Sequence, residues 1–170
     1  SEIIGANLTF DIIKNLSSSF KYNFSTDLTQ NNQLTTRNKS NTIFYTGDDP
    51  ENNQQEWYKL VPDWQFRLSG LEKIFPFKRI ANSVQLEHAR SGKSTETIRF
   101  DEDVETRTNW GYTNSYSPFL GLSITSKWGV TGNIRYTTSS NFTYTATSGD
   151  NKSERSGFDV TLSYSKSTGF

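Results

Sequence analysis

Strict alternation of apolar and polar residues over 117–136 constrains this chain more than any other feature. From position 120 to 128 every second residue is apolar or small, and beyond Gly129 the alternation resumes with Val130, Ile134 and Tyr136 on the apolar side. Successive side chains of a strand point to opposite faces, so this pattern predicts a hairpin whose strands are apolar on one face and polar on the other. Each arm has about nine residues, close to the length that spans a bilayer as a tilted strand.

A second hairpin of the same kind is expected near the start of the chain. Residues 4–12 and 16–24 alternate in the same way on either side of Lys14-Asn15. Aligning Gly5 with Gly121, and Tyr22 with Tyr136, makes 3–25 and 117–139 a hairpin repeat with two extra residues at the turn of the first copy. Strands with one apolar and one polar face are typical of membrane β-barrels, which have lipid outside and water inside.

The composition agrees with strands of this type and excludes other classes. The chain has 22 Ser, 21 Thr and 15 Asn, about a third of its 170 residues, yet its aromatic content of 14% argues against disorder. The net charge is zero, so no global field indicates a nucleic-acid partner. The absence of cysteine excludes disulfides and thiolate metal sites, and no apolar run is long enough for a transmembrane helix. With no Met and no signal peptide, we expect a mature product or a piece of a longer chain.

Further alternation predicts eight to ten strands in total. The additional strands are expected at 42–46, at 64–69, from 83 onward, at 141–146 and at 158–165. The polar stretch 27–41 is expected to continue a strand or to form an outside loop, and 148–156 is expected to be a loop. An aromatic group before the central hairpin suits either an interfacial girdle or a soluble core; it comprises Trp110, Tyr112 and Tyr116.

The segment 71–81 departs from the period of two. Its apolar residues approximate helical spacing, which Pro76 interrupts, so we expect a short amphipathic helix or a compact turn at a barrel rim or along the membrane interface. Lys73, Lys78 and Arg79 would then face lipid headgroups. An ordinary packed connector is an equally good interpretation.

No catalytic, cofactor-binding or metal site is predicted, and we do not expect an enzyme. The chain has no paired His residues, no nucleophile elbow and no phosphate-binding loop, and the single His88 is expected to be structural. The acidic groups at 48–51 and 101–105 are expected to be solvated turns. The more specific alternatives are weak calcium binding by 48–51 and a lumen-facing charge patch at 101–105.

Four stretches resemble the SprA (Sov) family of giant outer-membrane translocons. The segment 61–91, VPDWQFRLSGLEKIFPFKRIANSVQLEHARS, is similar to the family's "PNW-x-x-x-Y-x-GLSKI…F-K-S-x-x-x-x-H-x-Y". The segment 117–139 is similar to its "FSPLIGI-x-x-T-W-K-x-G-x-x-x-x-x-x-Y-x-x-S" hairpin, and 3–25 resembles another copy. The segment 158–170 is similar to the "E-I-x-L-x-Y-x-K-x-G-F" ending of a repeat.

This resemblance implies a place in type IX secretion and gliding motility, at the bacterial outer membrane and cell surface. The chain would then be a small part of the wall of a channel that passes folded proteins through a polar lumen. The implied partners are the lipid bilayer, secreted cargo proteins, and plug or gating subunits, with no nucleic acid and no small-molecule substrate. The resemblance implies no cofactor.

The sequence thus predicts an all-β chain in which 1–170 forms a single segment. The expected architecture is an antiparallel transmembrane β-barrel, or an arc of one, built of meandering strands with the helical connector at 71–81. Two alternatives remain: a small stand-alone outer-membrane barrel, porin-like or structural, and a soluble secreted β-sandwich of the adhesin type. Strands of nine residues favour the barrel, because sandwich strands average five to six.

Overall fold

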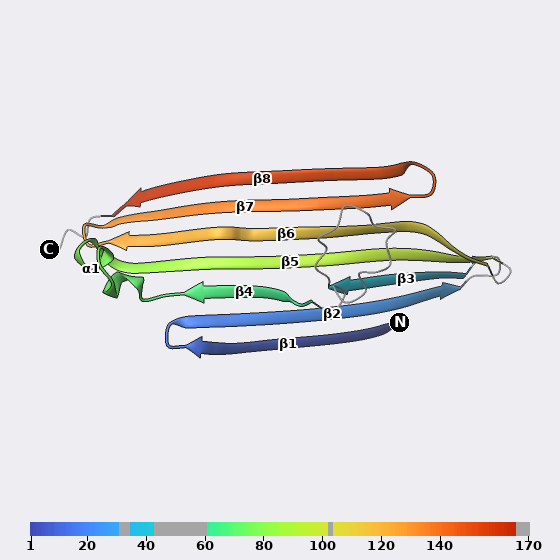
Figure 1. Ribbon diagram of the computed structural model, residues 1–170, viewed down its shortest axis with the longest axis horizontal. Coiled ribbons are helices and arrows are strands. Elements are labelled where there is room, and N and C mark those ends of the chain that lie inside the picture. The colour runs from blue at the N-terminus through green and yellow to red at the C-terminus, as the bar shows by residue number, and fades with distance from the viewer. Residues whose placement is uncertain (31–34, 43–60, 102–103, 166–170) are drawn as a thin grey trace.

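The chain forms one antiparallel sheet of long strands (Figure 1). The computed structural model describes residues 1–30, 35–42, 61–101 and 104–165. The strands are β1 (Glu2–Ile13), β2 (Leu16–Gln30), β3 (Thr35–Thr42), β4 (Asp63–Leu68), β5 (Ala81–Asp101), β6 (Val104–Ser126), β7 (Val130–Thr145) and β8 (Gly149–Tyr164). The predicted all-β, antiparallel class is confirmed, with eight strands in the described part of the chain.

Neighbours in sequence are also neighbours in the sheet, with one irregularity. The order is β1-β2-β3-β5-β6-β7-β8, and β4 pairs with β2 and β5 just as β3 does. The strands β3 and β4 therefore share one lane, end to end (Figure 1). Side chains replace the ladder bonds at the break: Asn23 N donates to Thr42 Oγ1 at 2.9 Å, and Gly92 N donates to Asp63 Oδ1 at 2.7 Å.

Several strands are longer than the alternation predicts. The strand β6 has 23 residues and includes the aromatic group at 110–116 without a break. The expected loop at 148–156 is wrong, because β8 begins at Gly149, which pairs with Thr145. Its first half is polar on both faces, so the sequence has no apolar alternation there even though the backbone pairs normally. Of the strand expected at 42–46, only Thr42 lies within the described residues, where it ends β3.

The two hairpins of the sequence repeat are β1–β2 and β6–β7. Their apolar residues share one face in both, but the register differs by two residues, because Tyr22 pairs with Ala6 whereas Tyr136 pairs with Leu120. The turns are short: Lys14-Asn15 joins β1 to β2, with Asn15 at φ 81°, and Gly129 at φ 84° completes the turn between β6 and β7.

The connector at 71–81 is a compact turn, not one continuous helix. A 3₁₀ turn, η2 (Leu71–Lys73), precedes a single α-helical turn, α1 (Phe77–Ile80). Pro76 lies between them and has no N–H to continue a helical ladder. The connector lies at one end of the sheet beside the β6–β7 turn, where Lys127 N donates to Ile80 O at 3.0 Å (Figure 1).

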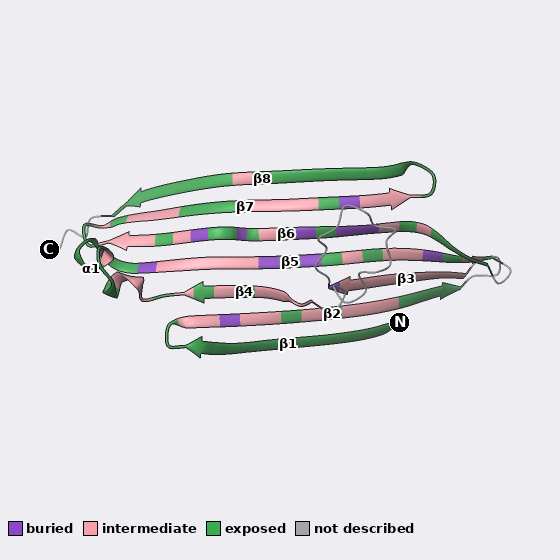
Figure 2. Ribbon diagram, viewed as in Figure 1, coloured by how far each residue is buried: buried purple, intermediate pink, exposed green. Residues whose placement is uncertain are grey.

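The core is small for a chain of this length. The buried hydrophobic side chains among the described residues are few: Ala81, Val84, Ile98, Tyr112 and Phe142. Large hydrophobic side chains are instead exposed along β1, β7 and β8, and both outer strands are exposed along most of their length (Figure 2). No helix in the described part of the chain is long and apolar enough to cross a membrane.

Candidate functional site: the two faces of the sheet

One face of the sheet is apolar across every lane near the connector. Residues directly opposite each other in an antiparallel pair point to the same face, so the register defines the surface. One row crosses four neighbouring lanes as Leu86, Leu122, Ile134 and Val160. We call this surface the apolar face; it includes Ile4, Leu8, Phe10, Ile13, Leu16, Phe20, Phe24, Phe66, Leu86, Leu120, Leu122, Ile124, Val130, Ile134, Tyr136, Phe158, Val160, Leu162 and Tyr164.

Much of the apolar face is open. Leu162 is 73% exposed, Leu8 59% and Val160 54%. All eight described strands belong to the same sheet, so none of them packs over this face as a second layer. Water-soluble monomers rarely expose apolar patches larger than a few hundred Å². An apolar surface of this kind is typical of an interaction site for lipid or for another protein.

The apolar face is a slanted band. Its upper edge lies at Ile4 in β1, whose register row reaches Lys152 in β8, whereas the first apolar residue of β8 on this face is Phe158. Between these two outer strands the edge descends six residues over six lane steps, although the row of Ile4 itself contains Tyr112 in β6 and Phe142 in β7. With about 3.3 Å per residue and about 4.8 Å between strands, the line that joins the two outer edges is inclined by about 35° to the register rows. This angle is at the lower end of the strand tilt of about 35–45° in membrane barrels.

The height of the band also matches a bilayer. In β1 the band runs from Ile4 to Ile13, which pairs with Leu16. Those nine residue steps measure about 30 Å along the strand, or about 24 Å along the normal of a membrane in which the strand is tilted by about 35°. Barrels of the outer membrane carry an apolar band about 25 Å tall.

The opposite face, here the polar face, has its own side-chain ladder. Small polar side chains bond to asparagine on the neighbouring strand: Thr97 Oγ1 donates to Asn38 Oδ1 and Thr113 Oγ1 to Asn141 Oδ1, both at 2.9 Å. Ser123 Oγ donates to Asn133 Oδ1 at 2.5 Å. Such groups remain hydrated and present no apolar surface.

Several charges of the polar face are paired with one another. Glu87 accepts from Arg67 Nε at 3.1 Å and lies 3.8 Å from Arg135 Nη2. The register places Gly121 between Glu87 and Arg135, and a Cβ there would come within 3.3 Å of the Glu87 Cβ. Gly121 therefore lets the two charged side chains meet across β6.

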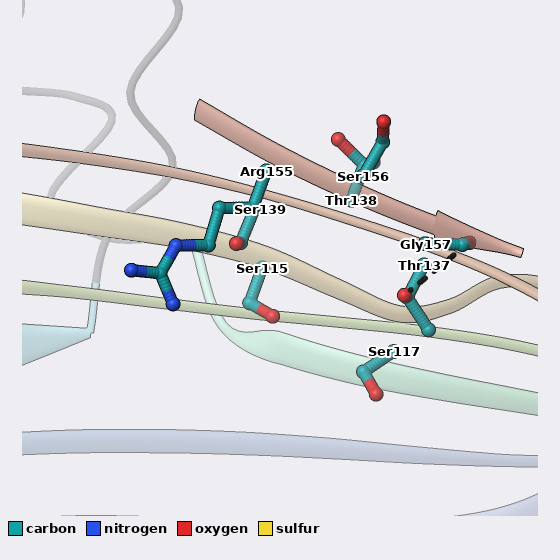
Figure 3. Close-up of a pocket in the computed structure, with 8 residues that line it drawn as sticks. All are labelled: Ser115, Ser117, Thr137, Thr138, Ser139, Arg155, Ser156 and Gly157. Atoms are coloured by element: carbon teal, nitrogen blue, oxygen red, sulfur yellow. Dashed lines mark hydrogen bonds between the residues drawn. The ribbon is translucent and has the colours of Figure 1, made fainter. Parts of the chain in front are cut away.

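A shallow hollow of about 300 Å³ lies between β6, β7 and β8 (Figure 3). Hydroxyl side chains and one guanidinium line it: Ser115, Ser117, Thr137, Thr138, Ser139, Arg155 and Ser156, together with Gly157. Thr137 Oγ1 donates to Gly157 O at 3.5 Å. The hollow has the same small polar chemistry as the rest of the polar face.

His88 lies among aromatic rings on the apolar face. Its ring centroid is 5.8 Å from that of Tyr116 and 5.7 Å from that of Phe119. Its Nδ1 is 2.6 Å from the carbonyl oxygen of Phe119, and because a carbonyl only accepts, Nδ1 carries the proton. The expected aromatic group divides here: Tyr116 packs at His88, whereas Trp110 and Tyr112 join a separate buried cluster with Phe142.

Arg90 is the charged residue that sequence analysis missed. It occupies the row of Trp64 and Tyr116, at the upper edge of the band, and its side chain is 0% exposed. Its guanidinium lies 5.2 Å from the Trp64 ring centroid and donates to Asn114 Oδ1 at 3.0 Å. Burial of an arginine is a tertiary property, which a lone basic residue in an alternating strand does not indicate.

The predicted polar candidates lie apart from one another. The acidic group at 48–51 lies outside the described residues, as do 102–103 of the second group; Asp101 ends β5 and Glu105 lies in β6. In the part of the chain that the structure describes, no three His, Cys, Asp or Glu residues come together as metal ligands. Lys73, Lys78 and Arg79 are exposed on the connector. No protein-family model, curated protein or solved structure matches this chain.

Proposed function

We propose that this chain is a wall segment of an outer-membrane protein-export channel, of the kind that its resemblance to the SprA (Sov) family implies. The observation that carries the proposal is the two-sidedness of one open sheet: a slanted apolar band about as tall as a bilayer faces one way, and a hydrated polar face lies behind it. Lipid covers the band, and the polar face lines the lumen.

The open edges favour an arc over a closed small barrel. Within the described residues β1 and β8 each have one neighbour, and they do not pair with each other. A free edge inside a bilayer leaves unsatisfied N–H and C=O groups, so β1 and β8 would pair with further strands of a larger wall. A soluble sandwich needs a second layer over the apolar face, and the described strands supply none.

The polar face suits the passage of folded proteins. Its hydroxyl and amide groups bond to one another, and its Glu87 is neutralised by arginines, so these parts of the face offer a cargo protein neither an apolar patch nor an unpaired carboxylate. A channel of this kind has no active site; the width and polarity of its lumen, together with plug or gating subunits, set what passes.

Neighbouring residues on opposite faces supply the test. The chain has no cysteine, so a single introduced thiol is unique. Asn133→Cys lies on the polar face and Ile134→Cys on the apolar face. In outer membranes, a water-soluble maleimide should label Asn133→Cys and leave Ile134→Cys unmodified, and a stalled cargo protein should protect and crosslink to Asn133→Cys alone. Equal labelling of the two thiols, or a chain that folds as a monomer in plain buffer, would contradict the proposal.

A further inference from the structure

The connector end of the sheet combines exposed cations with exposed apolar side chains. Three basic residues lie on the connector and one on the adjoining β6–β7 turn; we call Lys73, Lys78, Arg79 and Lys127 the basic rim. The apolar side chains beside them are Phe75 at 73% exposure, Trp128 at 66% and Ile74 at 58%. This combination is typical of a surface at the boundary between headgroups and acyl chains.

The basic rim is held together as one surface. Lys127 Nζ donates to Lys78 O at 2.8 Å, which ties the β6–β7 turn to α1. The Arg79 guanidinium lies 5.8 Å from the ring centroid of Phe75, so a cation and an aromatic side chain lie side by side. Trp128 lies two residues before Val130, which pairs with Tyr164 of the apolar face, and the rim is therefore continuous with that face.

The charge of the rim is not balanced locally. The only acid in 69–81 and 126–130 is Glu72, and its Oε2 accepts from Val84 N at 3.2 Å. Within the described residues, none of the four rim cations forms an ion pair. Elsewhere in the sheet, Arg67 and Arg107 of the polar face are paired with carboxylates.

We infer that the basic rim binds the phosphate groups of anionic phospholipids and fixes the depth at which the wall sits in the membrane. This inference rests on the proposed membrane location of the sheet. The rim lies at the end of the sheet with the Lys14-Asn15 and Gly129 turns, so its cations contact the headgroups of one leaflet.

The test compares two fourfold variants of the full chain on vesicles. The rim variant is Lys73→Gln, Lys78→Gln, Arg79→Gln and Lys127→Gln. The control removes four cations from the far half of the sheet: Lys93→Gln, Arg99→Gln, Lys152→Gln and Arg155→Gln. Binding is measured by flotation with zwitterionic phosphatidylcholine vesicles and with vesicles that contain phosphatidylglycerol. Quenching of Trp128 by lipids brominated at different depths, read as the difference from Trp128→Phe, reports its position.

At low salt the unmodified chain should bind the anionic vesicles at least about tenfold more tightly than the zwitterionic ones, because each cation near an anionic surface contributes to binding. The rim variant should lose this preference and the control should keep it. Salt should weaken the preference in both proteins that have it. Bromines near the headgroups should quench Trp128 more than bromines near the chain ends.

Three results would overturn the inference. The rim variant could keep the preference, the control could lose it equally, or inorganic phosphate could abolish it at an ionic strength where chloride does not, which would indicate a free-phosphate site. If lipid charge has no effect on binding, the inference also fails, and an acidic protein becomes the expected partner of the rim. Folding in both vesicle types without a preference refutes the rim alone, whereas failure to fold in either one refutes the proposed wall.

Discussion

Leu162→Arg tests directly whether the apolar face meets lipid. Leu162 is 73% exposed, so its side chain makes few contacts inside the sheet and its replacement creates no cavity. In water the substitution should change the free energy of unfolding by no more than about 0.5 kcal/mol, as for most surface positions. In lipid it would place a charge close to the middle of the hydrocarbon.

The depth of Leu162 in the membrane follows from its distance to the upper edge of the apolar band. Leu162 is four residues below Phe158, the upper edge in β8, which is about 13 Å along the strand and about 11 Å along the normal of a membrane in which the strand is tilted by about 35°. The band is about 24 Å tall, so Leu162 lies near its midplane. An arginine there costs about 2–4 kcal/mol in a membrane barrel, a shift of about 30-fold to 1,000-fold in the unfolding equilibrium.

Thr161→Arg is the matched control, because Thr161 is adjacent in sequence, exposed, and on the polar face. Denaturant unfolding in phospholipid vesicles, followed by tryptophan fluorescence and heat-modifiable gel mobility, should show a lower midpoint for Leu162→Arg than for Thr161→Arg. Equal midpoints for the two variants would refute the assignment of the apolar face to lipid.

Three further predictions concern stability, each read from denaturant midpoints. Gly129→Ala should cost about 3 kcal/mol, because φ is 84° and a Cβ would lie near a carbonyl oxygen, whereas Gly149→Ala, at φ 75° with open space around it, should cost about 1 kcal/mol. Arg90→Lys should cost about 2 kcal/mol, since an ammonium cannot reproduce the planar contacts of the buried guanidinium; an unchanged midpoint would show that charge alone matters there. Gly121→Ala should cost about 1–2 kcal/mol, because its Cβ would come within 2.8 Å of a proline ring; wild-type stability would mean that the strand shifts without penalty.

The sequence was sufficient to predict the fold class in those strands that have one apolar and one polar face. Alternation through Leu122, Ile124 and Ile134 correctly places these residues on one face of adjacent antiparallel strands. It fails in the first half of β8, because a strand that is polar on both faces has no period to detect. The connector was predicted as a helix or a compact turn. The structure has the turn, because Pro76 lacks the N–H that a continuous helix would need there.

The two faces of the candidate site were predictable from the sequence, but the features that depend on strand pairing were not. The periodicity assigns each residue to a face, but the slant of the band depends on pairing register, which residues distant in sequence determine together. The burial of Arg90 likewise depends on Trp64 and Asn114, which come from two other strands. The residues 48–51 lie outside the described part of the chain, so the interpretation of that acidic group stays a prediction.

The shared lane of β3 and β4 has a consequence for how such a wall can change in evolution. Thr42 pairs with Lys93 and Trp64 with Arg90, so Asp63 lies opposite Ser91 and a single residue of β5, Gly92, lies opposite the break. One residue would bridge Thr42 to Asp63 in register and keep every side chain on its face. The strands β3 and β4 are thus two parts of one interrupted strand. The bonds from Asn23 N to Thr42 and from Gly92 N to Asp63 close the ladder on both sides of the break, so the lane can be interrupted here while the neighbouring strands keep their partners.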